Sequence, residues 1–122
     1  MSSDWSHYLD LAQELFGQAT SSLHEDANLR SSISRAYYAT YHKARHRLYD
    51  KWGISVPEDA SAHGQVRREF KRKNQRWIAT TLNRMRLDRN DADYKDSIIN
   101  SATTARENLK RANRVILTLN RL

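Results

Sequence analysis

Two short segments hold the residues of this chain that are best suited to chemistry. The stretch from Arg35 to Ala44 reads RAYYATYHKA, and the stretch from Arg89 to Tyr94 reads RNDADY. Each combines Arg and Tyr with either His or Asp, inside segments that otherwise have the pattern of a helix. Guanidinium groups bind phosphates and aromatic rings stack on bases, so these residue types indicate a cleft, an interface or a ligand site.

Arg89 continues the apolar line of its predicted helix. The apolar side chains between Ile78 and Met85 follow helical steps of four and three, and the next position on that line is Arg89. An Arg there must pair with a carboxylate, line a cleft or lie at a subunit interface, because an unpaired buried charge is costly. Two interpretations stay open: an ion pair with Asp93 or Asp91, and an Arg that faces a phosphate.

A basic and aromatic stripe runs through RAYYATYHKA beside an apolar one. Its members, at helical steps of three and four, are Arg35, Tyr38, His42, Arg45 and Tyr49. The stripe suits a nucleotide, through guanidinium contacts and ring stacking, and it suits a dimer interface equally well. Arg35 and His42 are also a candidate catalytic pair, although two helical turns of about 10 Å separate them.

His42 and His46 stand four residues apart, a spacing at which two histidines on one helix face can hold a metal ion. No HExxH signature surrounds them, and a third ligand such as His63 would have to come from elsewhere. We therefore expect surface or interface histidines, with no metal and no cofactor. His63 lies near the start of a predicted helix and is a candidate ligand-binding residue.

The densest positive charge lies in the third predicted helix and just after it. Six basic residues occur within ten positions, with only Glu69 against them. They are Arg67, Arg68, Lys71, Arg72, Lys73 and Arg76. If the chain binds RNA, these residues are the expected phosphate contacts, and the binding weakens steeply with salt. A solvated charged face of a helix explains the same residues equally well.

Length and composition fit one domain in a reducing compartment. A chain of 122 residues can bury a core without disulfides, and the absence of Cys excludes a disulfide framework and a cysteine nucleophile. With 21 Lys and Arg against 14 Asp and Glu, the charge of +7 favours acidic partners such as RNA, DNA or an acidic protein. The N-terminus lacks a signal-peptide pattern and no stretch is long enough to span a membrane, so we expect a soluble, cytoplasmic protein.

Apolar periodicity predicts helices from end to end and no strand. The expected helices cover about residues 4–23, 26–52 and 62–73, then about 74 into RNDADY, and 96–119, with a loop over 53–61. The first is expected to bury a stripe from Trp5 to Leu23, and the fourth to bury Trp77. Apolar residues from Ile98 to Leu119 repeat in the rhythm of a near-parallel helix seam. We therefore predict an all-α domain over residues 1–122, an up-and-down bundle of four long helices plus one short helix.

Taken together, the motifs resemble the HEPN superfamily, named for higher eukaryotes and prokaryotes nucleotide-binding. The resemblance rests on RAYYATYHKA, on His63 and Gly64 ahead of Val66 and Phe70, on LNRMRLDRNDADY and on the Ala-spaced last helix. It covers nearly the whole chain and is to the small prokaryotic members with an RAYYA-type second helix and an ADY-type fourth helix. It implies a dimerising helical bundle, a nucleotidyltransferase neighbour in toxin–antitoxin pairs and, in many members, metal-independent RNase activity.

RNases of this family carry an Arg, usually followed by a polar residue such as Asn, and a His about four to six residues after the Arg. Arg89 and Asn90 match the start of the motif, whereas Asp93 and Tyr94 stand where the His would be. Metal-free RNA cleavage needs a base, an acid and a cation. Arg89 is suited to be the cation and Asp93 is a conceivable base, but a Tyr hydroxyl is a poor base at neutral pH.

Two functions therefore stay open. The first is a HEPN-type component of a toxin–antitoxin or defence system that binds RNA or a nucleotide together with a nucleotidyltransferase. Its candidate ligand-binding residues are Tyr38, Arg45, Tyr49, Asn90 and His63. The second is a metal-independent endoribonuclease toxin that uses Arg89 with Asp93 and Tyr94, or Arg35 with His42. The missing His favours the first. We expect a homodimer in either case, and Tyr94 is a candidate for nucleotidylation by the partner.

Overall fold

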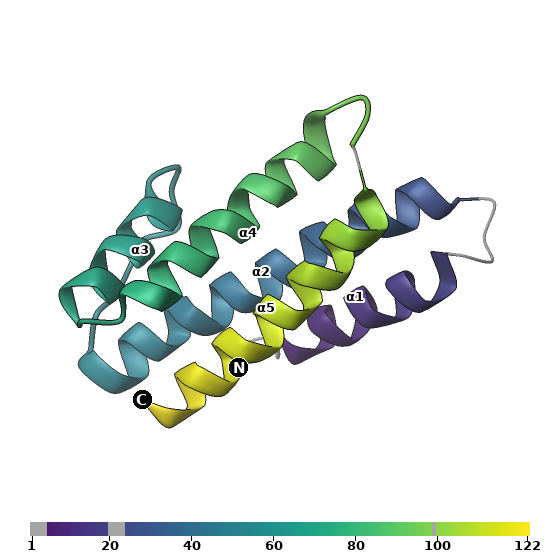
Figure 1. The fold of residues 1–122 in the computed structure, drawn as a ribbon. Helices are drawn as coiled ribbons and strands as arrows, with labels where there is room; N and C mark the ends of the chain where they lie inside the picture. Colours follow the sequence, from purple (N-terminus) through teal and green to yellow (C-terminus); the bar gives the residue numbers. More distant parts are fainter. Residues whose placement is uncertain (1–4, 20–23, 99) are drawn as a thin grey trace.

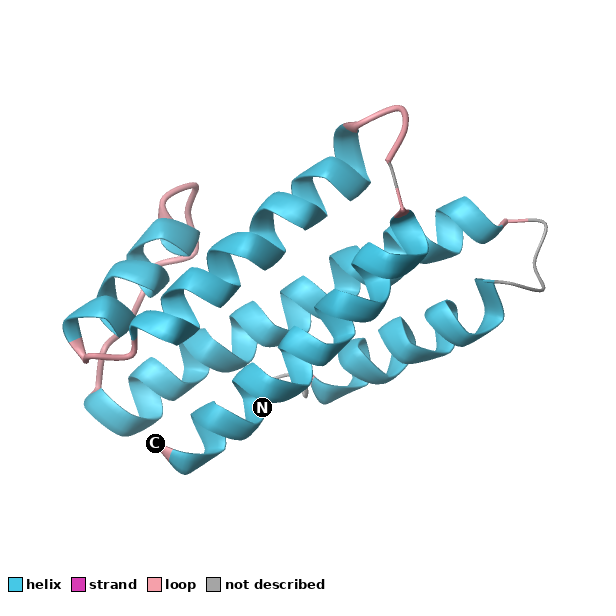
Figure 2. Ribbon diagram, viewed as in Figure 1, coloured by secondary structure: helices cyan, strands magenta, loops and turns pink. Residues whose placement is uncertain are grey.

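The computed structural model describes residues 5–19, 24–98 and 100–122 (Figure 1). Over these ranges the chain forms five α-helices and no strand, so the prediction of an all-α fold is confirmed (Figure 2). The helices are α1 (Ser6–Ala19), α2 (Glu25–Trp52), α3 (Ala62–Arg72), α4 (Arg76–Tyr94) and α5 (Ser101–Arg121).

α2 is the central element, because it contacts each of the other four helices (Figure 1). Its 28 residues make it the longest helix, about 42 Å at 1.5 Å per residue. The apolar stripe predicted for it is buried: Leu29, Ile33, Ala36, Tyr37, Tyr41, Ala44 and Leu48. α3 packs against α4 and α2, and the ring of Trp52 at the end of α2 meets that of Phe70 in α3, with centres 6.3 Å apart. This end of α2 is where α3 and its basic residues are held.

Two residues with positive φ set the chain reversals on either side of α3. Gly53 ends α2, as its sequence position predicts, with φ 68°, a conformation that glycine adopts without steric cost. Asn74 has φ 58°, which Asn tolerates better than most residues. Because the turn at Asn74 separates α3 from α4, α4 begins at Arg76, later than the sequence predicts.

The prediction that Trp77 is buried is wrong. Its side chain is 48% exposed, whereas the neighbouring Ile78 is fully buried. The buried positions of α4 continue through Leu82 and Met85, so its inner face is centred on Ile78. Trp77 lies about 100° from Ile78 around the helix axis and therefore falls outside that face.

The last helix begins at Ser101, five residues later than the sequence predicts. Lys95 has an extended backbone after α4, and the guanidinium group of Arg30 donates hydrogen bonds to the carbonyls of Ala92, Lys95 and Asp96. These carbonyls are occupied by a side chain, so the chain does not continue as helix at this point.

The inner face of α5 differs in part from the predicted seam. Ala105, Ala112 and Leu119 are buried as predicted, but Val115 and the polar Asn108 are buried as well. In α1, Ala12 is fully buried. Trp5, Leu9 and Phe16 are partly covered, and Leu23 lies outside the described residues. None of the helices in the described ranges combines the length and the apolar character that crossing a membrane requires.

Candidate nucleic-acid interface

A tyrosine and a histidine from different helices meet where α2 contacts α3. The hydroxyl group of Tyr37 hydrogen-bonds to Nδ1 of His63, and the ring of His63 stacks on Tyr41 with ring centres 4.1 Å apart. Burial raises the pKa of Tyr37 well above its ordinary value and lowers the pKa of His63. Tyr37 therefore keeps its proton, and its hydrogen-bond partner is a neutral imidazole.

The charges of three arginines act on this pair. Besides burial, the charges of Arg86, Arg89 and Arg67 lower the pKa of His63. Arg67 comes from α3, and the other two come from α4. Burial, followed by the charge of Arg86, also lowers the pKa of Arg67. Arg67, Arg86 and Arg89 are hereafter the arginine cluster.

Two members of the arginine cluster lack a counter-charge. None of the ion pairs between described residues includes Arg67 or Arg86. Both side chains are only partly exposed. Neighbouring like charges that are partly removed from water destabilise each other, so a bound anion would relieve the cluster. Phosphate and carboxylate are the anions that match the planar donor array of a guanidinium group.

Arg89 is fixed by contacts on both sides. Its Nε lies 2.9 Å from Oδ2 of Asp93, and it donates hydrogen bonds to Oδ1 of Asn90 (3.0 Å) and to the hydroxyl of Tyr38. The guanidinium carbon lies 4.8 Å from the ring centre of Tyr38 and 5.9 Å from that of Tyr94. Arg89 thus forms the ion pair with Asp93 that the sequence left open, and it joins the RNDADY segment to RAYYATYHKA through Tyr38.

No family model, curated protein or solved structure matches the chain.

The arginine cluster and its neighbours suit anion binding better than acid–base catalysis. Nδ1 of His63 is already engaged in the hydrogen bond with Tyr37, and the lowered pKa of His63 leaves the ring without a second proton at neutral pH. Asp93, the other candidate base, is paired with Arg89. Neither group is free to take or give a proton as it stands.

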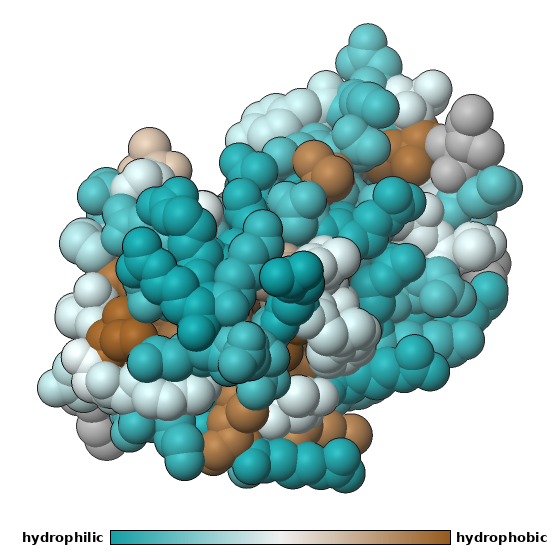
Figure 3. Space-filling model, turned by 60° about the vertical axis from the view of Figure 1, so that its left-hand side comes forward, coloured by the Kyte–Doolittle hydropathy of each residue, from teal (hydrophilic) through white to brown (hydrophobic). Residues whose placement is uncertain are grey.

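Exposed basic residues continue from the arginine cluster along α3. Arg72 pairs with Glu69 at 2.7 Å, and Nζ of Lys73 lies 5.5 Å from the ring centre of Trp52. Three more of the basic residues predicted to contact RNA have no ion pair with another described residue: Arg68, Lys71 and Arg76. Figure 3 turns the α3 side of the molecule forward and shows a largely hydrophilic surface. Positive charge therefore extends well beyond the cluster.

The structure does not join His42 to Arg35. The ring of His42 stacks on Trp5, with centres 3.7 Å apart and planes 10° apart, and its Nδ1 is buried without a partner in the described structure. Burial lowers the pKa of His42 to about 4. Nε of Arg35 is also buried without a described partner. A neutral ring covered by Trp5 is poorly placed for the catalytic role that the Arg35–His42 spacing allowed.

Arg45 and Tyr49 lie at the loop over 53–61 and not at the arginine cluster. Arg45 donates from Nε and Nη2 to the carbonyl of Val56 (2.9 and 2.7 Å) and pairs through Nη1 with Glu58 (2.6 Å). Its guanidinium group therefore holds the loop against α2. Tyr49 is 63% exposed and lines a hollow of about 400 Å³ beside the same loop.

Sequence reasoning missed Tyr37 and Arg86 as site residues. Tyr37 falls on the buried stripe of α2, so its pattern predicts a core residue, and only the fold shows that its hydroxyl reaches α3. Arg86 stands three residues before Arg89, and residues three apart are neighbours on a helix surface. This spacing could have predicted that Arg86 lies beside Arg89. Within the described residues, no three His, Asp or Glu side chains are grouped so that they could hold a metal ion.

Proposed function

We propose that this chain binds RNA through the phosphate backbone, with the arginine cluster at the centre of the site. One observation supports the proposal most directly: Arg67 and Arg86 are both partly buried, the charge of Arg86 lowers the pKa of Arg67, and neither has an ion pair in the described structure. A phosphate group supplies the missing negative charge and accepts paired hydrogen bonds from guanidinium groups.

The spread of charge favours an RNA chain over a single phosphate compound. The basic residues without an ion pair in the described structure extend from Arg67 and Arg68 through Lys71 of α3 to Arg76, which begins α4 nine residues after Arg67. One phosphate group cannot contact all of them. Successive phosphates of an RNA strand can, and proteins that bind strands in this way release counterions and bind less well as salt rises.

We further propose that the chain is a HEPN-like bundle of four long helices plus one short helix, and a component of a toxin–antitoxin or defence system. The order of RAYYATYHKA and RNDADY supports this, and so does Tyr94, which is 75% exposed and accessible to a modifying partner. Co-expression with the neighbouring nucleotidyltransferase should yield a complex and a nucleotide mass on Tyr94. If neither the complex nor the added mass on Tyr94 is found, the proposed nucleotidyltransferase partner is wrong.

A homodimer is part of the same proposal. Two exposed apolar or aromatic side chains, Leu87 and Tyr94, lie seven residues apart on the same side of α4. Exposed side chains in this register are typical of a helix that packs against another chain. Light scattering after gel filtration should give the mass of two chains for the wild type and of one chain for Leu87→Glu. A monomeric wild type at high concentration would rule the dimer out.

The RNA proposal is tested by fluorescence anisotropy with a labelled RNA of mixed sequence in EDTA. Arg67→Ala and Arg86→Ala should each weaken binding about fivefold and lower the salt dependence by about one phosphate contact. Arg114→Ala is the matched control, because Arg114 is an exposed arginine of α5 outside the cluster. If Arg114→Ala weakens binding as much as Arg86→Ala, the effect is one of net charge and the proposed site is wrong.

The same mixtures test the endoribonuclease alternative. After incubation, the RNA is separated on a denaturing gel and compared between wild type and Arg89→Ala. Intact RNA with salt-sensitive binding supports a binding module. Cleavage that disappears in Arg89→Ala would instead support the enzyme, with Asp93 released from its ion pair when the substrate binds.

A further inference from the structure

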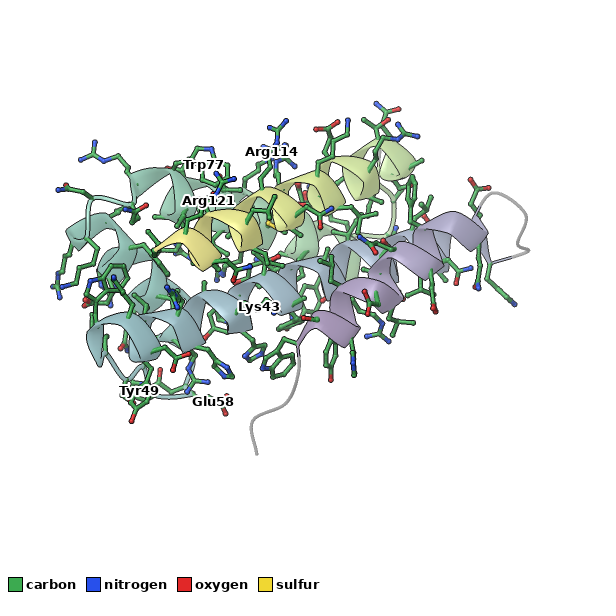
Figure 4. All side chains as sticks on the ribbon, turned by 90° about the horizontal axis from the view of Figure 1, so that it is seen from below. Lys43, Tyr49, Glu58, Trp77, Arg114 and Arg121 are labelled. Carbon is green, nitrogen blue, oxygen red and sulfur yellow. The ribbon has the colours of Figure 1, made fainter. Side chains whose placement is uncertain are left out.

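A small hollow lies where three helices meet: the start of α1, the second half of α2 and the end of α5. Its volume is about 230 Å³, below the range of about 300–1,000 Å³ that is usual for pockets of drug-sized ligands, so it suits a smaller molecule. In Figure 4, Lys43 is labelled on α2 between the start of α1 and α5. No member of the arginine cluster lines this hollow.

Three charged side chains of α2 line the hollow. Lys43, Arg47 and Asp50 follow one another at helical steps of four and three, so they share one face of the helix. None of them forms an ion pair with another described residue, and they do not pair with one another. Elsewhere in the chain, Arg30 and Arg89 each pair with an acid four positions away. Two cations and one anion at the hollow are therefore left without charged partners in the described structure.

The guanidinium group of Arg47 is held by the end of α5 but is not satisfied by it. Its Nη2 donates a hydrogen bond to the backbone carbonyl of Leu122, whereas its Nε is buried and has no hydrogen-bond partner in the described structure. A buried donor without an acceptor is costly. A carboxylate in the hollow would lie beside two cations, Lys43 and Arg47, and would supply the missing acceptor.

The rest of the wall is largely apolar. Ile116 and Leu119 of α5 line the hollow, and Leu119 is only 2% exposed. Trp5 lines it as well, and its ring stacks on that of His42 with centres 3.7 Å apart. Because the packing of three helices already holds these side chains, they lose little conformational entropy when a ligand binds. The hollow thus offers an apolar surface beside its charged face.

We propose that this hollow binds a free α-amino acid with an apolar side chain, such as leucine. The carboxylate of the ligand lies against Lys43 and Arg47, and its ammonium group lies against Asp50. Its side chain packs against Leu119 and Trp5. The site shares no residue with the arginine cluster and does not depend on the RNA proposal.

The spacing of the charges favours an amino acid over a molecule with one charge. Side chains three positions apart on a helix have Cβ atoms about 5–6 Å apart, so one small zwitterion can reach Arg47 and Asp50 together. A plain carboxylate would leave Asp50 unpaired, and a plain amine would leave both cations unpaired. An α-amino acid carries both charges and an apolar group on a single carbon atom.

Isothermal titration with L-leucine tests this site, together with three analogues that each lack one group. L-leucinamide lacks the carboxylate, N-acetyl-L-leucine lacks the ammonium group, and glycine lacks the apolar side chain. Each analogue should bind the wild type about tenfold less tightly than leucine does, because each leaves one part of the hollow without its contact. If N-acetyl-L-leucine binds as tightly as leucine, the hollow takes a plain carboxylate and the amino-acid proposal is wrong.

Two variants assign each charge of the ligand to a side chain. Lys43→Met keeps most of the apolar stem, so it should weaken leucine binding about tenfold and leave leucinamide binding unchanged. Asp50→Asn should weaken leucine binding by a similar factor and leave N-acetyl-L-leucine binding unchanged. Lys51→Met is the matched control and should bind leucine as the wild type does, because Lys51 is an exposed lysine of α2 that does not line the hollow. Circular dichroism establishes that each variant is folded.

Further arms separate this site from the RNA site. Arg86→Ala should bind leucine normally while binding RNA weakly, and Asp50→Asn should show the reverse. An excess of leucine should not displace labelled RNA from the wild type, and displacement would contradict a separate site. The proposal is overturned if millimolar leucine, isoleucine and phenylalanine all give no heat, or if Lys43→Met and Asp50→Asn bind leucine as tightly as the wild type does.

Discussion

The hydroxyl group of Tyr37 shares a hydrogen bond with Nδ1 of His63, and this bond joins the central helix α2 to α3. The two rings also stack, with centres 5.6 Å apart. α3 carries the basic surface and contributes Arg67 to the arginine cluster, so the bond helps to set where that positive charge lies relative to α4. A polar contact inside an aromatic layer thereby positions the candidate RNA site.

Tyr37→Phe should lower the free energy of unfolding by about 1–3 kcal/mol. The substitution keeps the ring but leaves Nδ1 of His63 without its hydrogen-bond partner in a partly buried place. Urea unfolding followed by circular dichroism measures the change. Tyr94→Phe removes a hydroxyl from a 75% exposed ring and should stay within about 0.5 kcal/mol of wild type. Equal midpoints for the two variants would show that the Tyr37 bond contributes nothing.

His42 should make the protein acid-sensitive. Burial lowers its pKa to about 4 in the folded chain, against an ordinary value of 6.5, and Glu58 only partly opposes this. Between these two pH values the unfolded chain binds a proton that the folded chain does not, so stability falls as the pH falls from 6.5 to about 4. Below about 4 both states are protonated, and this loss stops.

The measurement is the urea midpoint as a function of pH for wild type and His42→Phe. The Phe ring can still stack on Trp5, and Nδ1 of His42 has no described partner that the change would remove. All other titratable groups are common to both proteins, so their difference isolates His42. The variant should lose less stability between pH 6.5 and 4. Parallel curves would mean that the folded state accommodates a charged His42.

The helices were predictable because each buries one face, and one buried face leaves a period in the sequence. The stripe of α2 is the clearest case, since every position predicted to be inside is buried. The prediction failed at Trp77, whose size and apolarity mark it as core although α4 places it outside the buried arc. It failed again before Ser101, because Arg30 reaches the end of α4 from 62 or more residues away in sequence. No local pattern records such a contact.

The candidate site was predictable only in part, for the same reason. Arg89 was found because a charge on an apolar line is conspicuous within one helix. Tyr37 and His63 were not paired in advance, because their bond joins residues 26 positions apart on different helices. The effect of the Arg86 charge on Arg67 likewise depends on how α3 packs on α4. The sequence shows which residues share a face of one helix, whereas only the fold shows which residues of different helices lie close together.

Asp88→Ala should be among the more destabilising substitutions of a polar residue in α4. Asp88 is only 8% exposed, and its Oδ2 accepts a hydrogen bond from Nδ2 of Asn108 (3.0 Å) and lies 3.5 Å from Nη1 of Arg111. Both partners belong to α5, so the carboxylate links two helices that otherwise contact each other little. Removing it leaves buried Asn108 with a lost partner, and we expect a loss of about 2–4 kcal/mol in urea unfolding.

Asp91→Ala is the matched control for Asp88→Ala. Asp91 pairs with Lys95 at 3.3 Å, four residues along the same helix end, and both side chains are well exposed. Exposed pairs of this kind contribute about 0–1 kcal/mol. A similar loss in the two variants would show that the link between α4 and α5 at Asp88 adds nothing beyond an ordinary surface ion pair.

Arg86→Gln should stabilise the folded chain while weakening RNA binding. The charge of Arg86 lowers the pKa of Arg67, and Arg86 has no ion pair among the described residues, so removing its charge relieves repulsion. We expect a gain of about 0.5 kcal/mol at low ionic strength that disappears near 1 M salt, where charges are screened over about 3 Å. Arg84→Gln, two positions away, removes a partner of Asp88 at 3.6 Å and should instead be neutral or destabilising. If Arg86→Gln destabilises the chain at every salt concentration, Arg86 serves the fold and the arginine cluster is not a site held open for an anion.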